Sequence, residues 1–79
     1  MTRETLEYIV PFLVDNPDEI EVTELHDEQS GDLVLEVSVH PDDTGKVIGR
    51  NGRIIRALRT VAKAAGQRHG RQVNVEVVD

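Results

Sequence analysis

Residues 45–59 read GKVIGRNGRIIRALR and contain the turn that decides the expected fold. Gly49 and Gly52 bound a four-residue segment, and apolar residues at helical spacing follow it directly. Glycine adopts backbone angles that are closed to other residues, so we expect a tight turn that opens into a helix. The stretch carries five positive charges and no negative one. It therefore predicts an exposed helix–turn–helix corner with a basic surface.

The apolar spacing after this turn predicts a helix over residues 52 to about 65. At about 100° per residue, one face of the helix collects its apolar side chains, which are Ile54, Ile55, Leu58, Val61, Ala62 and Ala65. The adjoining polar side carries its cations, which are Arg53, Arg56, Arg59 and Lys63. We expect Gly66 to end the helix, because glycine commonly terminates helices, and Gly70 to lie in the following loop. Residues 46–48 form a shorter helical or turn segment before the glycines.

Alternating apolar and polar residues predict the strands. Residues 33–39 and 72–78 alternate regularly, as expected for strands with one buried face. In residues 20–25 the pattern switches sides, with Ile20 and Val22 on one face and Thr23 and Leu25 on the other. Such a switch predicts either a bulge or a strand that is covered on both faces. The segment between the first two strands, DEQSGD at 27–32, has the composition of a turn.

The first helix is predicted over residues 4–14, with Thr2 as its N-terminal cap. Pro11 removes a backbone donor inside this segment, so we expect a kink or an early end there. Tyr8 and Phe12 lie four residues apart and are predicted to pack on each other. The order of elements is then α-β-β-α-α-β. It predicts one α+β domain over residues 1–79, a three-stranded sheet with helices packed on one face.

Length and composition exclude several classes of protein. The 79 residues include no cysteine, which excludes disulfides, thiolate catalysis and thiolate metal sites. The apolar runs are too short for a membrane span and no signal-peptide pattern opens the chain, so a cytoplasmic location is expected. A domain of this size buries only about 60% of the surface of its unfolded chain. Self-association into a homodimer, or association with another chain, would add to its stability.

The charges divide the chain into two halves. Residues 1–43 hold thirteen acidic residues and one arginine, whereas residues 44–79 hold eight basic and two acidic residues. The halves therefore carry −12 and +6, and no acid occurs between Thr44 and Arg71. Such asymmetry indicates contact with a polyanion. The alternative is that the two halves neutralise each other across the fold.

The basic turn has the properties of a phosphate-binding site. No side chain obstructs the backbone at a glycine, and the first N–H groups of the following helix favour an anion. Apolar neighbours of the turn could line a groove for bases, although at least one of them could belong to the core instead. We therefore predict a site for single-stranded nucleic acid. Its candidate residues are Lys46, Val47, Ile48, Gly49, Arg50, Asn51, Gly52, Arg53, Ile54 and Arg56.

The segment VIGRNG at 47–52 resembles the VIGxxG signature of KH (K-homology) domains, with a GxxG loop at 49–52. The predicted element order resembles the type II arrangement of these domains. Together with YIVPFLVDNPDEIEV near the start, the chain is similar to small bacterial single-KH proteins of the KhpA (YlqC) kind. The resemblance implies RNA binding, an RNA-chaperone role in the cytoplasm and a KhpB-like (Jag or EloR) partner with KH and R3H domains. It also implies a link to cell elongation and cell-wall homeostasis.

Other functions have less support in the sequence. His26, His40 and His69 lack the spacing of metal ligands, so we expect neither a metal site nor a cofactor. No pattern predicts a buried carboxylate pair for acid–base catalysis, and we do not expect an enzyme. The remaining alternative is a protein-interaction or dimerisation module with weak or no RNA binding of its own.

Overall fold

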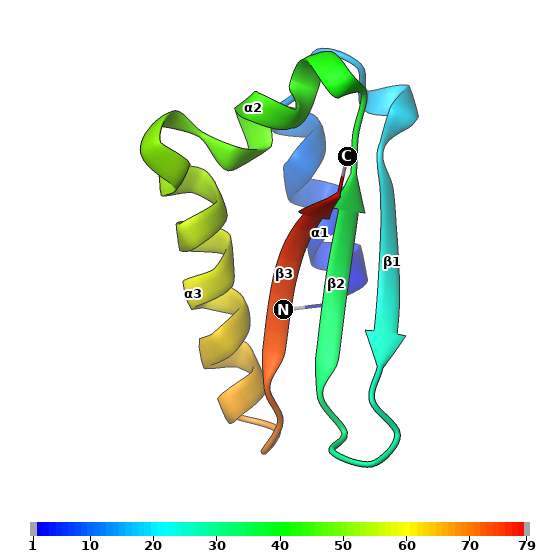
Figure 1. Ribbon diagram of the computed structural model, residues 1–79, viewed down its shortest axis with the longest axis vertical. Coiled ribbons are helices and arrows are strands. Elements are labelled where there is room, and N and C mark those ends of the chain that lie inside the picture. The colour runs from blue at the N-terminus through cyan, green and yellow to red at the C-terminus, as the bar shows by residue number, and fades with distance from the viewer. Residues whose placement is uncertain (1, 79) are drawn as a thin grey trace.

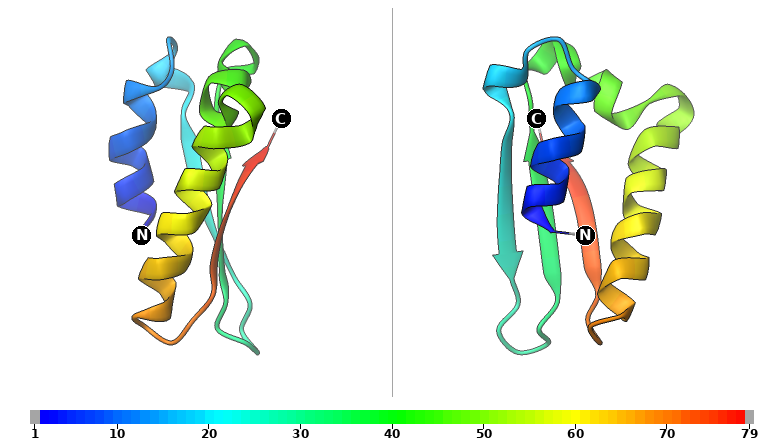
Figure 2. Two further views of the ribbon diagram at one scale, coloured as in Figure 1. Left: turned by 90° about the vertical axis from the view of Figure 1, so that its left-hand side faces the viewer. Right: turned by 180° about the vertical axis from the view of Figure 1, so that it is seen from behind.

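Three strands form one layer of the molecule, and the helices cover one of its faces (Figure 1 and Figure 2). The computed structural model describes residues 2–78. In it β1 (Glu21–His26) pairs antiparallel with β2 (Leu33–Ser38), and β3 (Val73–Val78) pairs parallel with β2 on the other side. The helices are α1 (Arg3–Ile9), α2 (Thr44–Ile48) and α3 (Arg53–Gln67). The predicted α-β-β-α-α-β order and the α+β class are confirmed.

The core lies between the helices and the sheet and is wholly aliphatic. Leu6 and Val10 from the first helical segment meet Leu35 and Val37 of β2 there, and all four side chains are fully buried. β2 alternates buried and half-buried residues along its whole length, as predicted for a strand with one face on the core. No helix among residues 2–78 combines the length and the apolar character needed to cross a membrane.

Pro11 ends the first helix early, as predicted. α1 stops at Ile9, and the 3₁₀ helix η1 (Val10–Phe12) continues the chain with the proline near its start. A proline fits there because the first residues of a helix need no backbone donor. At the other end, Thr2 is the cap, since its Oγ1 accepts a hydrogen bond from Thr5 N at 3.3 Å.

β1 is simpler than its sequence predicts. The strand pairs with β2 in unbroken register from Glu21–Ser38 to His26–Leu33, so the predicted bulge is wrong. The other predicted possibility, a strand covered on both faces, is wrong as well, because Leu25 points away from the core and is 47% exposed. Since the helices cover only one face of the sheet, an apolar residue out of phase with Val22 remains in solvent.

α3 is longer and buries a narrower stripe than predicted. Gly66 lies inside the helix, which ends at Gln67 instead. A Cβ at Gly66 would lie 2.7 Å from the carbonyl oxygen of Arg71, so the glycine permits a close approach of the returning chain. Val61 was assigned to the apolar face, but it is 54% exposed. The predicted face is thus too wide, because α3 lies along the edge of the sheet and only part of its circumference meets other elements.

Candidate nucleic-acid interface

The GxxG loop (residues 49–52) joins α2 to α3 at one corner of the molecule (Figure 1). Gly49 and Gly52 have φ values of 80° and 73°, and Asn51 between them has a φ of 58°. A Cβ at Gly49 would also lie 2.7 Å from Cγ1 of Ile54, whereas one at Gly52 would meet nothing closer than 3.9 Å. Gly49 is therefore required both for its backbone angle and for its contact with α3, and Gly52 for its angle alone.

Hydrogen bonds within the corner hold the loop through its carbonyl groups. Gly52 N donates to Gly49 O at 3.0 Å, and Arg56 Nη2 donates to Asn51 O at 2.7 Å. Arg50 and Arg53 are exposed at the corner and form no ion pair with an acid within residues 2–78, so their guanidinium donors are open to solvent. α3 begins directly after the loop, with the positive end of its dipole at the same corner. The loop thus presents donors and a positive field to an anion.

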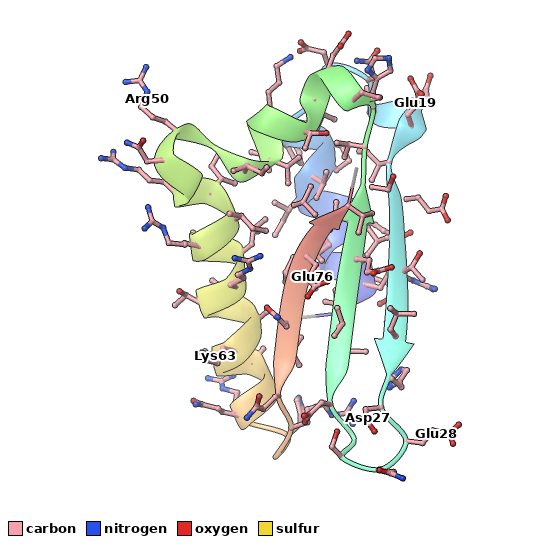
Figure 3. All side chains as sticks on the ribbon, viewed as in Figure 1. Glu19, Asp27, Glu28, Arg50, Lys63 and Glu76 are labelled. Carbon is pink, nitrogen blue, oxygen red and sulfur yellow. The ribbon has the colours of Figure 1, made fainter. Side chains whose placement is uncertain are left out.

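Most of the cations lie at the GxxG corner and along α3, and several acids lie near the hairpin of β1 and β2, but Glu76 projects from β3 between these regions (Figure 3). Figure 3 shows Arg50 extending into solvent from the corner, with Lys63 farther along α3, whereas Asp27 and Glu28 lie near the hairpin of β1 and β2. Among the cations of residues 44–78, Lys46 alone forms an ion pair with an acid in the described part of the chain. The two halves therefore remain separated, and the alternative of mutual neutralisation is not what the fold shows.

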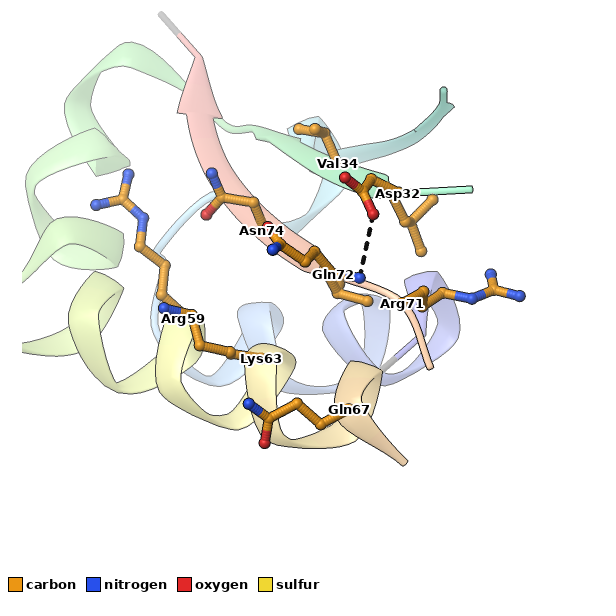
Figure 4. Close-up of a pocket in the computed structure, with 10 residues that line it drawn as sticks. Asp32, Val34, Arg59, Lys63, Gln67, Arg71, Gln72 and Asn74 are labelled. Carbon is orange, nitrogen blue, oxygen red and sulfur yellow. Dashed lines mark hydrogen bonds between the residues drawn. The ribbon is translucent and has the colours of Figure 1, made fainter. Parts of the chain in front are cut away.

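A groove runs between α3 and the edge strand β3 (Figure 4). Its volume is about 630 Å³, and its polar lining includes one acid, Asp32, besides Arg59, Lys63, Gln67, Arg71, Gln72 and Asn74. It lies toward the C-terminal half of α3, and Lys63 is ten residues beyond Arg53. A helix rises 1.5 Å per residue, so these two positions are about 15 Å apart along the axis. That distance suits an extended strand of a few nucleotides.

The exposed edge of β3 is partly occupied by side chains of the groove. Arg59 Nε donates to Val75 O at 2.9 Å, and Asn74 Oδ1 accepts from Val75 N at 2.9 Å. These two bonds satisfy backbone groups that an edge strand otherwise leaves open. They also place a guanidinium and an amide beside the backbone, where both can hydrogen-bond to a base edge.

The family model of the KhpA/KhpB KH domain matches residues 3–77 of this chain. The chain belongs to this family. It is 54% identical to the RNA-binding protein KhpA of Streptomyces coelicolor, over 100% of this chain and 94% of that protein. The RNA-binding protein KhpA of Clostridium acetobutylicum is 49% identical, over 96% of this chain and 99% of the relative. The RNA-binding protein KhpA of Aquifex aeolicus is 42% identical, over 98% of this chain and 95% of the relative. No solved structure gave a significant match.

These comparisons confirm the predicted resemblance and the KH fold. The three relatives are named for RNA binding and not for a catalytic activity. In residues 2–78 of this KH domain, no group of three or more histidine and carboxylate side chains comes close enough to hold a metal ion. His40 has a structural contact, because its Nδ1 accepts a hydrogen bond from Asp42 N at 3.0 Å.

The predicted loop residues and their apolar neighbours differ in how far they are exposed to solvent. Arg50, Asn51 and Arg53 are exposed at the corner, where the prediction placed them. Val47 is fully buried, which makes it the apolar candidate that belongs to the core. Ile48 is 37% exposed and Ile54 is half-buried, so both contribute to the surface.

Two of the predicted cations have partners within the protein. Arg56 holds the Asn51 carbonyl and so shapes the GxxG loop. Lys46 Nζ bonds to Asp15 Oδ2, and it also lies 3.3 Å from Asp43 Oδ1. Neither contact could be expected from sequence spacing, because both depend on how the turns fold back.

The groove adds residues that the sequence did not predict. The amides of Gln67, Gln72 and Asn74 enter the site only because β3 returns beside α3. Arg71 was recognisable in part, since it ends the run without acids. Asn74 alternates with the valines of β3, which is the pattern of an ordinary solvent-facing strand residue. No local pattern marks Gln67.

Asp43 is buried and binds the turn that follows η1. Its Oδ2 accepts hydrogen bonds from Asn16 N at 2.9 Å and from Asn16 Nδ2 at 3.0 Å, and its Oδ1 accepts from Asp15 N at 3.2 Å. Burial opposes ionisation of the carboxyl group, but the Asn16 side chain, these backbone donors and Lys46 lower the pKa of Asp43 to about 2. The side chain makes no capping bond to α2. It anchors the start of α2, which carries the GxxG loop.

Proposed function

We propose that this KH domain binds single-stranded RNA through its GxxG loop. The observation that carries the proposal is the corner itself, where two glycines at positive φ precede α3 and the exposed donors of Arg50 and Arg53 form no ion pair with an acid in the described chain. Phosphate binds to such donors without regard to base identity. The RNA-binding names of the three relatives support the same function.

The groove beside α3 receives the bases in this proposal. An RNA backbone held at the GxxG loop and following α3 places its bases over β3, beside Arg59 and Asn74. About four nucleotides are bound in this way. The residues that line the groove include no aromatic side chain, so base stacking contributes little to the affinity for RNA. We therefore expect modest affinity and modest sequence discrimination.

The test is RNA binding as a function of salt concentration. Each phosphate contact to a single strand contributes about −0.7 to the slope of log K against log salt. Contacts at Arg50, Arg53 and the groove cations should give a slope of about −2 or steeper. A slope near zero, or no binding to any single-stranded probe, would contradict the proposal.

A cellular role follows from the family resemblance. We propose that the protein acts in the cytoplasm as an RNA chaperone or post-transcriptional regulator, in cell elongation and cell-wall homeostasis, with a KhpB-like partner. The shared KhpA/KhpB family model supports kinship with such a partner. Co-purification from the native host, followed by sequencing of crosslinked RNA, tests both parts.

The second candidate function is a protein-interaction or dimerisation module, and the aromatic residues favour it. Tyr8 and Phe12 pack edge to face with ring centroids 5.6 Å apart, which confirms their predicted pairing. They are nevertheless 73% and 77% exposed, although they are the only aromatic residues in the chain. Aromatic rings bury a large area at interfaces. A contact at these two rings, on α1 and η1, would leave the GxxG loop open, so both functions are compatible.

A further inference from the structure

Lys46 is the cation nearest to the GxxG loop on α2, and two carboxylates hold it. Its Nζ bonds to Oδ2 of Asp15 and lies 3.3 Å from Oδ1 of Asp43. These bonds, with Asp15 first and Asp43 second, raise the pKa of the Lys46 ammonium. The site therefore carries two negative charges around one positive charge, within one helical turn of Gly49.

The two carboxylates differ in their burial and in the groups that they contact. Asp43 is fully buried and satisfies backbone and side-chain donors of the turn at residues 15–16. The side chain of Asp15 is 76% exposed, and Lys46 is its partner in the described chain. The backbone N–H of Asp15 makes the contact to Asp43, and a substitution of the side chain leaves that bond in place. The Asp15 carboxylate thus contacts Lys46, and its removal breaks none of the hydrogen bonds that Asp43 makes to residues 15–16.

We propose that Asp15 withholds Lys46 from the RNA phosphates and thereby sets the affinity of the GxxG loop. The inference rests on the proposed RNA binding. A phosphate that approaches Lys46 competes with an intramolecular carboxylate, which is already at contact distance. It also meets the net negative charge of the pair of acids. Asp15 is a positioning residue in this scheme, since it acts through Lys46 and touches no nucleotide.

The experiment is a double-mutant cycle on RNA affinity. Asp15→Asn, Lys46→Gln and the double variant are titrated with a labelled, randomised single-stranded RNA octamer at several salt concentrations. The control is Asp42→Asn, which makes the same charge change one residue from Asp43. The Asp42 side chain is 85% exposed and contacts His40, not Lys46. Circular dichroism verifies that every variant is folded.

Asp15→Asn should tighten RNA binding about two- to fivefold, the range expected for release of an exposed ion pair. The salt slope should steepen by about 0.7, because one more phosphate contact forms. Lys46→Gln should weaken binding more in the Asp15→Asn background than in the unaltered protein. The pKa of Lys46, followed by NMR of the labelled lysine side chain, should fall in Asp15→Asn.

Three results would count against the scheme. Equal gains from Asp15→Asn and Asp42→Asn, without coupling to Lys46, would show a net-charge effect and overturn the inference. Loop-dependent RNA binding without any gain in Asp15→Asn would overturn it too, and would leave the proposed function standing. RNA binding that survives disruption of Arg50 and Asn51 would overturn the proposed function, and this inference with it.

Discussion

A Cβ atom at Gly49 would lie 2.7 Å from Cγ1 of Ile54 and 2.9 Å from the backbone nitrogen of the same residue. This contact lets α3 begin immediately against the turn, so that the GxxG loop and the first turn of the helix form one surface. It also distinguishes Gly49 from Gly52, whose Cβ would have space.

Gly49→Ala should therefore destabilise the domain more than Gly52→Ala. An alanine costs about 1–2 kcal/mol in the left-handed conformation of Gly52, and about 1–3 kcal/mol at Gly49, whose φ of 80° and ψ of 169° lie in a region that is essentially restricted to glycine. The overlap with Ile54 adds about 1–3 kcal/mol at Gly49 alone. The free energy of unfolding in urea measures both. Gly45→Ala is the matched control, because Gly45 lies in α2 with open space around it, and it should be neutral or stabilising by up to about 1 kcal/mol. Equal losses at Gly49 and Gly52 would contradict the role assigned to Ile54.

The double variant Arg50→Asp, Asn51→Asp should lose RNA binding by about tenfold or more, because it places two negative charges at the proposed phosphate site. The fold should persist, since both side chains are exposed and Asp tolerates the left-handed backbone that Asn51 adopts. Fluorescence anisotropy with a single-stranded RNA probe measures the loss.

The control for this variant is Arg3→Asp with Gln29→Asp. It makes the same change in net charge at exposed positions outside the loop and groove. If both double variants lost affinity equally, a general charge effect would explain the result and the loop assignment would fail.

Asp43 makes the stability of the domain depend on pH in a defined window. Its pKa lies near 2 in the folded chain, below the ordinary value of 3.8, because its hydrogen bonds outweigh its burial. A depressed carboxyl pKa stabilises the fold above the unfolded value, and that contribution is lost as the pH falls from about 3.8 toward about 2.

Asp43→Asn should therefore lower the urea midpoint at pH 7, since an amide cannot replace a carboxylate that accepts from three donors of residues 15–16. The difference in urea midpoint between the variant and the unaltered protein should become smaller between pH 3.8 and pH 2, because the Asp43 carboxylate of the unaltered protein is protonated there. Asp27 also has a lowered pKa, through the backbone N–H groups of Gln29 and Ser30, but it is present in both proteins. A constant gap across the window would contradict this account.

Tyr8→Ala with Phe12→Ala should weaken association with a partner chain and leave RNA affinity nearly unchanged. The rings lie on α1 and η1, whereas the proposed RNA site lies on α2, α3 and β3. Sedimentation measures self-association, and co-purification measures a heterologous partner. Leu25→Ala removes an exposed apolar side chain from the opposite face of the sheet and serves as the control. Association that responds equally to both variants would exclude a specific site on α1.

The sequence by itself determined the order of the elements, the early end of α1 and the position of the turn. These features depend on local properties: the period of apolar residues, a proline that lacks a donor and glycines that accept positive φ. The motif VIGRNG also identified the family before any contact was known.

Only the tertiary structure decided which side chains are buried and which cations are unpaired. Val61 and Leu25 are apolar yet remain exposed, because no element covers them. Asp43 is buried against Asn16, 27 residues earlier, and Lys46 is paired with Asp15 for the same reason. The groove exists because β3 returns beside α3. Burial and ion pairing depend on distances between segments far apart in the chain, and no local period encodes those distances.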